Sequence, residues 1–241
     1  MIVIPMAGHS RRFSEAGYGV PKYMLLADGG TLFSHAVSSF SQYFLSVPFL
    51  FICRDIADTP NFIARQCSEL GIKSFACVVL DAPTSGQAET VALGLENSYF
   101  SLDEPVTIFN IDTFRPGFRF PDAVQASGYL EVFRGAGDNW SYVRPLADNS
   151  DRVAETTEKV PISDLCCTGL YHFKSGALYQ SAYRGFIQFD DIEKTSTEQY
   201  VAPLYNFLIN QGLDIRYHLI PREDVIFCGI PSEYEAFLAR K

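Results

Sequence analysis

Three cationic side chains near the start of the chain could bind phosphate groups. The opening segment MIVIPMAGHSRRFSEAGYGVPKYML leaves an apolar run at Gly8 and then carries Arg11, Arg12 and Lys22. A guanidinium can clamp phosphate oxygens with paired hydrogen bonds, and an ammonium adds a point charge. Glycine lets the backbone approach a phosphate closely. Together these groups would neutralise the charge that builds on a phosphoryl group during its transfer.

A carboxylate at the end of a second apolar run adds a candidate metal ligand. Asp112 closes the run TIFNID at residues 107–112. An ionised carboxylate at a strand end is costly unless it is solvated, paired or bound to a metal. Mg²⁺ prefers oxygen ligands and keeps several waters, so one or two carboxylates suffice to hold it. Asp112 is therefore a candidate metal ligand, with the capping of a turn as the alternative.

The composition and the net charge of the chain exclude several classes of partner. The chain has 241 residues, a net charge of -9 and 47% hydrophobic residues, which are the values of a globular protein with a full core. Its acidic surface repels nucleic acid and anionic lipid, so we expect small-molecule partners. Six scattered cysteines without a CxxC pair favour a reducing cytoplasm over a disulfide framework. The opening run has no basic region before it and is too short for a signal peptide.

The hydrophobic pattern predicts the α/β class. The short apolar runs MIVIPMA, SVPFLFIC, FACVVL and EPVTIFNID suit strands buried on both faces, as in a parallel sheet. Between these runs lie helical patterns at residues 31–44, 60–70 and 86–97. Strands and helices that alternate along the chain predict right-handed crossovers.

The second half of the chain is richer in strands. Residues 128–147 alternate polar and apolar side chains, LCCTGLYHF predicts a further strand, and residues 198–211 form a helical pattern that contains Pro203. SEYEAFLARK predicts a closing helix with Ser232 as its N-cap. We predict one domain over residues 1–241, with a nucleotide-binding half at 1–115 and an acceptor-binding half at 116–241.

The order of the motifs resembles that of the sugar-phosphate nucleotidyltransferases. PMAGHSRRF followed by VPKYMLL is similar to the family's glycine-rich signature and its PK motif, whereas GxGxxG and Walker fingerprints are absent. PTSGQAETVALGL, TIFNIDTF, TTEKVPISDLCCTGLYHF and VIFCGIPSEYEAF resemble later family segments in the family's order. The resemblance implies a Rossmann-like, GT-A-like three-layer α/β/α fold. It also implies a mixed, mainly parallel central sheet and a small sheet-rich acceptor-binding lobe.

The resemblance also implies an activity and a set of site residues. The family joins a nucleoside triphosphate to a phosphorylated sugar or similar alcohol and releases pyrophosphate. The catalytic residues would be Arg12, Lys22 and Asp112, with Asp112 holding Mg²⁺. Residues in contact with the nucleotide would be Ala7, Gly8, His9, Ser10, Arg11, Gly86, Gln87 and Asn110. Residues in contact with the acceptor would be Glu158, Lys159 and Gly169.

Departures from the family pattern leave alternatives open. Ser10 and Arg11 put side chains where the family keeps its loop slim, and the family's second metal aspartate falls at or near Cys228. A protonated thiol is a poor Mg²⁺ ligand. The metal would then depend on Asp112 with phosphates and water, or on a further carboxylate from Asp224, Glu233, Asp190 or Asp191. Otherwise activity is weakened or lost.

Two other classes of function remain as alternatives. A glycosyltransferase would use a similar nucleotide-binding half, but such enzymes usually hold the metal with a DxD pair, and this chain has NID at residues 110–112. A nucleotide or sugar-phosphate binding protein of the same fold would release no pyrophosphate. The usual setting of resembling proteins is the synthesis of precursors for capsule and other surface polysaccharides. The sequence identifies neither the base, for which cytidine is the working choice, nor the acceptor. An aromatic share of 14% leaves room for a homo-oligomeric interface.

Overall fold

The computed structural model describes residues 1–190 and 198–240, which form two compact units. Unit 1 comprises Met1 and the described residues of 84–108 and 120–222. Unit 2 comprises residues 2–83 and 109–119 and the described residues from 223 onward. The chain therefore enters each unit more than once. The predicted division at residues 115 and 116 stays a prediction.

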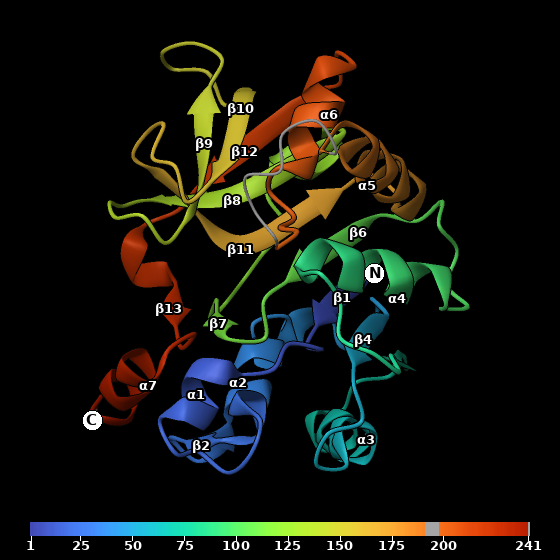
Figure 1. Ribbon diagram of the computed structural model, residues 1–241, viewed down its shortest axis with the longest axis vertical. Coiled ribbons are helices and arrows are strands. Elements are labelled where there is room, and N and C mark those ends of the chain that lie inside the picture. Colours follow the sequence, from blue (N-terminus) through green and yellow to red (C-terminus); the bar gives the residue numbers. More distant parts are fainter. Residues whose placement is uncertain (191–197, 241) are drawn as a thin grey trace. The chain divides into compact units, whose positions relative to one another are not determined.

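Unit 2 is built around three parallel strands (Figure 1). In the order β1–β4–β5, each strand pairs in parallel with the next, with Ile4 opposite Phe51 and Phe51 opposite Cys77. The principal elements of unit 2 are β1 (Ile2–Pro5), α1 (Arg11–Glu15), α2 (Leu32–Ser38), β4 (Phe49–Cys53), α3 (Thr59–Leu70), β5 (Phe75–Val79) and α7 (Pro231–Leu238). Its short elements are η1 (Lys22–Met24), β2 (Leu26–Ala27), β3 (Gly30–Thr31), η2 (Ser41–Tyr43), β7 (Thr113–Phe114) and β13 (Ile226–Phe227). The 3-10 helix η4 (Arg222–Asp224) begins at the last residue of unit 1.

An aromatic cluster around Phe40 packs against β4 in unit 2. Phe40 packs edge-on against Phe49, Phe109 and Phe118, with ring centroids 4.9–6.3 Å apart. Edge-to-face pairs add specific geometry to the burial of large apolar surfaces. Because the strands are parallel and packed in register, their carboxyl ends emerge at one edge, where ligands bind in such sheets.

Unit 1 holds a mixed sheet and three helices (Figure 1). Strand β12 pairs in parallel with β8, whereas β8 and β9 pair antiparallel with β11, and β10 pairs antiparallel with β9. The elements are α4 (Gln87–Glu96), β6 (Val106–Phe109), η3 (Asp122–Gln125), β8 (Gly128–Arg134), β9 (Ser141–Pro145), β10 (Val153–Glu158), β11 (Leu165–Phe173), α5 (Gly176–Asp190), α6 (Leu204–Asn210) and β12 (Ile215–Leu219). Together with unit 2, this confirms the predicted α/β class with a mixed sheet.

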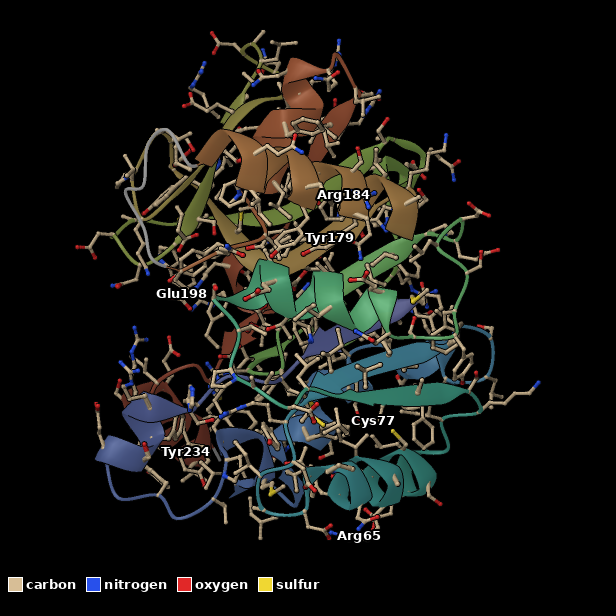
Figure 2. All side chains as sticks on the ribbon, turned by 45° about the vertical axis from the view of Figure 1, so that its right-hand side comes forward. Arg65, Cys77, Tyr179, Arg184, Glu198 and Tyr234 are labelled. Atoms are coloured by element: carbon tan, nitrogen blue, oxygen red, sulfur yellow. The ribbon has the colours of Figure 1, made fainter. Side chains whose placement is uncertain are left out.

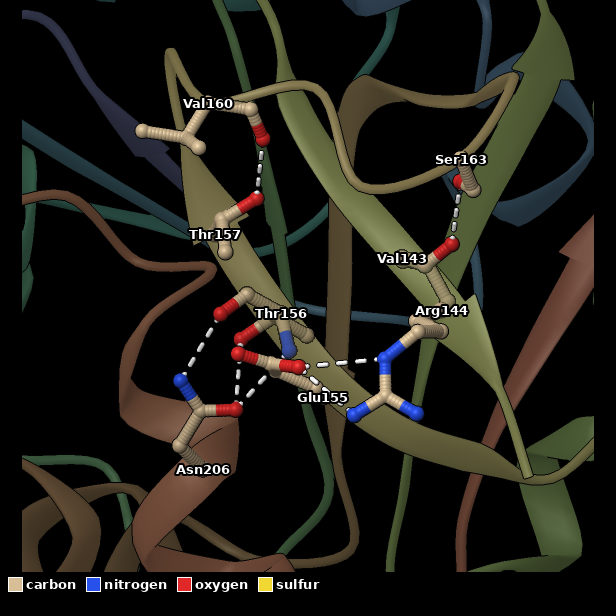
Figure 3. A network of polar contacts seen from close by, with 8 residues as sticks. All are labelled: Val143, Arg144, Glu155, Thr156, Thr157, Val160, Ser163 and Asn206. Atoms are coloured by element: carbon tan, nitrogen blue, oxygen red, sulfur yellow. Dashed lines mark hydrogen bonds and ion pairs between the residues drawn. The ribbon is translucent and has the colours of Figure 1, made fainter.

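A polar network ties β10 to its neighbours in unit 1 (Figure 3). The amide of Asn206 on α6 donates to the carbonyl of Thr156 at 2.8 Å, and its oxygen accepts from the Thr156 N–H at 2.8 Å. On the exposed side, the guanidinium of Arg144 on β9 binds the Glu155 carboxylate at 2.6 Å. The reciprocal amide pair leaves neither backbone group of Thr156 unsatisfied. It fixes the strand that ends at Glu158.

Several predicted element boundaries are wrong, each for a local reason. The pattern at residues 31–44 divides into α2 and η2, and the pattern at 198–211 yields a helix only from Leu204. Pro203 lacks a backbone N–H and stands as the N-cap of that helix, so the preceding residues are not helical. Ser232 lies inside α7, whose N-cap is Ile230. Within the described residues, no helix has both the length and the apolar character needed to cross a membrane.

Candidate active site

The loop after β1 folds back on the segment that carries Lys22. Ser10 has a left-handed backbone with φ 50°, and its hydroxyl accepts a hydrogen bond from the Lys22 backbone N–H at 3.3 Å. Ser10 departs from the family pattern. Its side chain joins the glycine-rich loop to the segment of the PK motif that carries Lys22. The side chains of Arg11 and Arg12, on the first turn of α1, are exposed.

The ammonium of Lys22 and the carboxylate of Asp112 form the central contact of unit 2. Lys22 Nζ lies 2.5 Å from Asp112 Oδ2, although the two residues are 90 positions apart in the sequence. The side chains are 21% and 19% exposed, so the pair is partly shielded but open to a ligand. A hydrogen bond between two charged groups is stronger than one between neutral groups. The structure therefore brings together two of the three residues predicted to be catalytic.

The residue predicted to replace the second metal aspartate lies beside Asp112. Strands β13 and β7 pair antiparallel, and the Cys228 N–H donates to the Asp112 carbonyl at 2.8 Å. Burial raises the pKa of the Cys228 thiol to about 12, with Glu233 and Asp112 contributing in the same direction. The thiol is therefore neutral at pH 7. Position 228 supplies no negative charge to the Asp112 site.

Among the alternative carboxylates, Glu233 is the one that lies near Asp112. A side chain on Gly229 would place its Cβ 3.2 Å from Asp112 Oδ2 and 3.6 Å from Glu233 Oε2. Glu233 Oε2 already accepts from the N–H groups of Gly229 at 2.8 Å and Ile230 at 3.2 Å. Its carboxylate is thus engaged in capping α7. Asp224 is exposed, and Asp191 and the side chain of Asp190 lie outside the described residues.

The donor chemistry at Asp112 fits a hydrated divalent cation. No cluster of three or more His, Cys, Asp or Glu side chains suited to a metal occurs within residues 1–190 and 198–240. Mg²⁺ needs no such cluster, because water and substrate phosphates complete its octahedral shell around one or two carboxylates. Asp112 supplies one carboxylate, with an oxygen that currently accepts from Lys22. The residues present therefore fit Mg²⁺ held by Asp112 together with substrate.

Arg54 is a further cation at the first loop that the sequence analysis missed. It directly follows β4, and its Nε donates to the Ala7 carbonyl at 3.1 Å while its Nη2 lies 3.0 Å from His9 Nδ1. Strands β1 and β4 are parallel neighbours, so Arg54 comes from the same sheet edge as the loop. A basic residue immediately after the second apolar run was the available signal.

The other predicted residues divide between the two units. Asn110 lies in unit 2, where its carbonyl accepts from the Thr113 N–H at 3.3 Å. Five predicted residues lie in unit 1: Gly86, Gln87, Glu158, Lys159 and Gly169. Gly169 has φ 93° at the register shift between Cys167 and Tyr171 in β11, the geometry of a β-bulge. The left-handed backbone at this position favours glycine by itself. The presence of Gly169 therefore does not depend on its predicted contact with the acceptor.

Gly86 is enclosed by backbone. Its φ is 153°, and an added Cβ would lie 2.4 Å from the Gln199 carbonyl oxygen and 2.5 Å from the Gln199 nitrogen. The Ala88 N–H donates to that carbonyl at 2.9 Å, and the Gln199 N–H donates to the Ser85 carbonyl at 2.9 Å. The resemblance implies that Gly86 allows a nucleotide to approach closely. In the structure, the close neighbour of Gly86 is another part of the chain.

We expect Gly86→Ala to destabilise unit 1 by about 2 kcal/mol or more, because backbone atoms cannot move aside as a flexible side chain can. Chemical denaturation monitored by circular dichroism measures the change in unfolding free energy. Gly8→Ala is the matched control, since a Cβ at Gly8 meets no atom within 4 Å. Equal stability of the two variants would contradict the close packing of Gly86 on Gln199.

Glu158 and Lys159 stand together at the end of β10. The Ser141 hydroxyl donates to the Glu158 carboxylate. Burial raises the pKa of Glu158 above its ordinary value of 4.5, against the opposing effects of Ser141 and Lys159. Lys159 has a left-handed backbone with φ 58°, and its N–H donates to the Trp140 carbonyl at 2.9 Å. The turn directs an exposed ammonium next to a half-buried carboxylate.

The raised pKa of Glu158 predicts a pH dependence of stability. Its folded pKa lies above the unfolded value, so its stabilising contribution is complete below about pH 4.5 and is lost as pH rises through the folded pKa. The unfolding free energy of Glu158→Gln relative to wild type should therefore increase as pH rises through this window. Denaturation curves at several pH values measure it, with Glu96→Gln as an exposed control. A difference independent of pH would contradict the burial of this carboxylate.

A solved structure of high sequence identity to this chain shows its family. The nucleoside-diphosphate-sugar pyrophosphorylase from Vibrio cholerae RC9 is 55% identical, with a TM-score of 0.97 over 100% of both chains. No family model matches the sequence, and neither does any curated protein.

More distant structures share the fold. The inositol-1-phosphate CTP transferase from T. maritima has a TM-score of 0.73 at 12% identity over 98% of this chain and 92% of that one. The UDP-glucose pyrophosphorylase from Acinetobacter baumannii has a TM-score of 0.71 at 12% identity over 98% and 91%. At such identities the likeness concerns the fold alone. Because of the 55% identity over full length, this chain belongs to the nucleoside-diphosphate-sugar pyrophosphorylases, a family of sugar-phosphate nucleotidyltransferases.

Proposed function

We propose that this protein transfers a nucleotidyl group from a nucleoside triphosphate to the phosphate of a sugar phosphate or similar alcohol phosphate. The products are a nucleoside diphosphate derivative and pyrophosphate. One observation carries the proposal: Lys22 and Asp112 meet at 2.5 Å in a chain that is 55% identical to a nucleoside-diphosphate-sugar pyrophosphorylase. An ammonium and a carboxylate at such a site can serve a polyphosphate and a cation together.

The reaction is an in-line displacement without a covalent protein intermediate. A phosphate oxygen of the acceptor forms a bond to the α-phosphorus, the bond from the α-phosphorus to the oxygen that bridges to the β-phosphorus breaks, and pyrophosphate leaves with that electron pair. We assign Arg12 and Lys22 to the triphosphate. We assign Lys159 to the acceptor phosphate. These residues supply position and positive charge.

For the nucleotide we assign the first loop in unit 2 and, from the resemblance alone, the start of α4 in unit 1. The loop residues Ala7 to Arg11 supply backbone and polar groups, Gln87 supplies an amide for a base edge, and Asn110 orients the ligand near Asp112. Glu158 and Gly169 would contact the acceptor. When bound at Asp112, Mg²⁺ would offset the negative charge of the phosphates. Lys22 would then pass from the Asp112 carboxylate to a phosphate oxygen.

We place this activity in the cytoplasm, in the synthesis of precursors for capsule or other surface polysaccharides, with a homo-oligomer as the working assembly. The six cysteines, all in the described part of the chain, are free thiols, as suits a reducing compartment.

A screen for pyrophosphate release tests the proposed function. Each of the four nucleoside triphosphates is mixed with Mg²⁺ and with glucose 1-phosphate, mannose 1-phosphate, inositol 1-phosphate or glycerol 3-phosphate. We expect pyrophosphate in amounts equal to the nucleoside diphosphate product for one pairing. A glycosyltransferase would consume a nucleotide sugar and release no pyrophosphate, which would contradict the proposal.

The neutral thiol of Cys228 favours a second candidate, a binding protein with weakened catalysis. In such a protein, position 228 supplies no negative charge beside Asp112. It would show a raised melting temperature with a nucleoside triphosphate, because a ligand that binds only the native state stabilises it by mass action. It would release no pyrophosphate with any acceptor. The thermal shift and the pyrophosphate assay therefore separate the two candidates.

A further inference from the structure

A three-residue segment of unit 1 contacts both the loop before α4 and the end of β10. The segment is Glu198–Tyr200, which is neither helix nor strand, and Glu198 is labelled in Figure 2. The side chains of Glu198 and Tyr200 are linked by hydrogen bonds to Lys159, whereas the backbone of Gln199 forms hydrogen bonds with Ser85 and Ala88.

The outer side chains hold the ammonium of Lys159. Lys159 Nζ donates to the Tyr200 hydroxyl, and the Tyr200 hydroxyl donates to the Glu198 carboxylate. The ammonium also lies 4.5 Å from the centroid of the Tyr200 ring. A lysine ammonium ends a flexible four-carbon stem and loses rotamer freedom when it is fixed. These hydrogen bonds through Tyr200 hold the Lys159 ammonium in place without a ligand.

The backbone of Gln199 is hydrogen-bonded to the loop before α4 and to the first turn of α4. Its N–H donates to the Ser85 carbonyl at 2.9 Å, and its carbonyl accepts from the Ala88 N–H at 2.9 Å. The Gln199 side-chain oxygen accepts from the Tyr183 hydroxyl at 3.1 Å. Gly86 leaves the space for this approach, since any Cβ there would lie under 3.0 Å from Gln199 backbone atoms. The middle of the segment is therefore tied to the loop at several points.

We propose that Tyr200 is a positioning residue for the acceptor, which holds the Lys159 ammonium where the acceptor phosphate binds. Through Gln199 the same segment ties Lys159 to the loop at Ser85–Gln87. This inference rests on the proposed function, which assigns Lys159 to the acceptor and Gly86 and Gln87 to the nucleotide.

Tyr200→Phe tests the inference, because it removes the hydroxyl and keeps the ring. The wild-type protein is first assayed with the four nucleoside triphosphates and the four acceptor phosphates named above, and the fastest pair is used. We expect the KM for the acceptor to rise about tenfold in Tyr200→Phe, as for the loss of a charge-assisted hydrogen bond, with little change in kcat. Tyr99→Phe is the control, since Tyr99 is 76% exposed.

A double variant separates positioning from a structural effect. If Tyr200 acts through Lys159, the effects of Tyr200→Phe and Lys159→Met on the acceptor KM are not additive. In the Lys159→Met background, Tyr200→Phe should then leave that KM unchanged. Additive effects, or an unchanged KM in Tyr200→Phe, would overturn the inference while the proposed function stands. A wild-type protein that releases no pyrophosphate would overturn the proposed function and this inference with it.

Discussion

Replacing Asp112 with Asn lowers kcat for pyrophosphate release by a factor of about 150, since an electrostatic contribution of this kind provides about 3 kcal/mol in the transition state. The amide keeps the shape of the side chain but carries no charge for a cation or for Lys22. Initial rates at saturating nucleoside triphosphate and acceptor measure the effect. The largest share of the loss should persist at high Mg²⁺, because a neutral amide is a weak ligand for this ion.

Asp122→Asn is the control for Asp112→Asn. Asp122 is an exposed aspartate in η3, and the substitution makes the same chemical change. Its kcat should stay within about twofold of wild type, as for a surface substitution away from the site. A near-wild-type rate for Asp112→Asn would remove Asp112 from the catalytic site. Equal losses in both variants would indicate a general effect of charge.

Replacing Lys22 with Met has two effects of opposite sign. We expect kcat to fall about a hundredfold, because a cation that faces the triphosphate is lost. We also expect the substrate-free protein to bind Mn²⁺, a probe for Mg²⁺, about tenfold more tightly, because the ammonium that opposes a cation at Asp112 is gone. Steady-state kinetics measure the first effect. Titration followed by the electron paramagnetic resonance of free Mn²⁺ measures the second.

Lys73→Met is the matched control, since Lys73 is exposed and belongs to the same unit. It should leave both kcat and Mn²⁺ affinity unchanged. Weaker Mn²⁺ binding in Lys22→Met would show that Lys22 supports the cation rather than competes with it. That outcome would contradict the exchange of partners proposed for Lys22.

The sequence predicted the elements that position the site better than it predicted their ends. The apolar runs became β1, β4, β5 and β6. Strands β1, β4 and β6 are buried almost throughout, as expected of strands covered on both faces. The prediction of burial on both faces is wrong for β5, whose residues are half-buried or exposed. The pattern at residues 60–70 became α3, which ends at Gly71 in a left-handed conformation. The boundaries failed where a single residue decides them. Pro203 is one case, and Ile230, which displaces Ser232 as the N-cap of α7, is another.

Contacts between residues far apart in the chain could not be predicted from residue types and spacing. The meeting of Lys22 and Asp112 was expected only through the resemblance, and the structure places them 2.5 Å apart. Nothing in the composition or spacing indicates that Gly86 packs on Gln199, because a backbone contact leaves no signature in the type of its partner. Arg54 was accessible in principle, since a cation that follows a buried strand emerges at the ligand edge of a parallel sheet.

A crystal structure with Mg²⁺ and a non-hydrolysable analogue of the preferred nucleoside triphosphate tests the central claim most directly. We predict Mg²⁺ at about 2.0–2.1 Å from a carboxylate oxygen of Asp112, its usual distance to oxygen. Lys22 Nζ should then donate to a phosphate oxygen of the analogue. A cation bound away from Asp112, with Lys22 and Asp112 still 2.5 Å apart, would contradict the account.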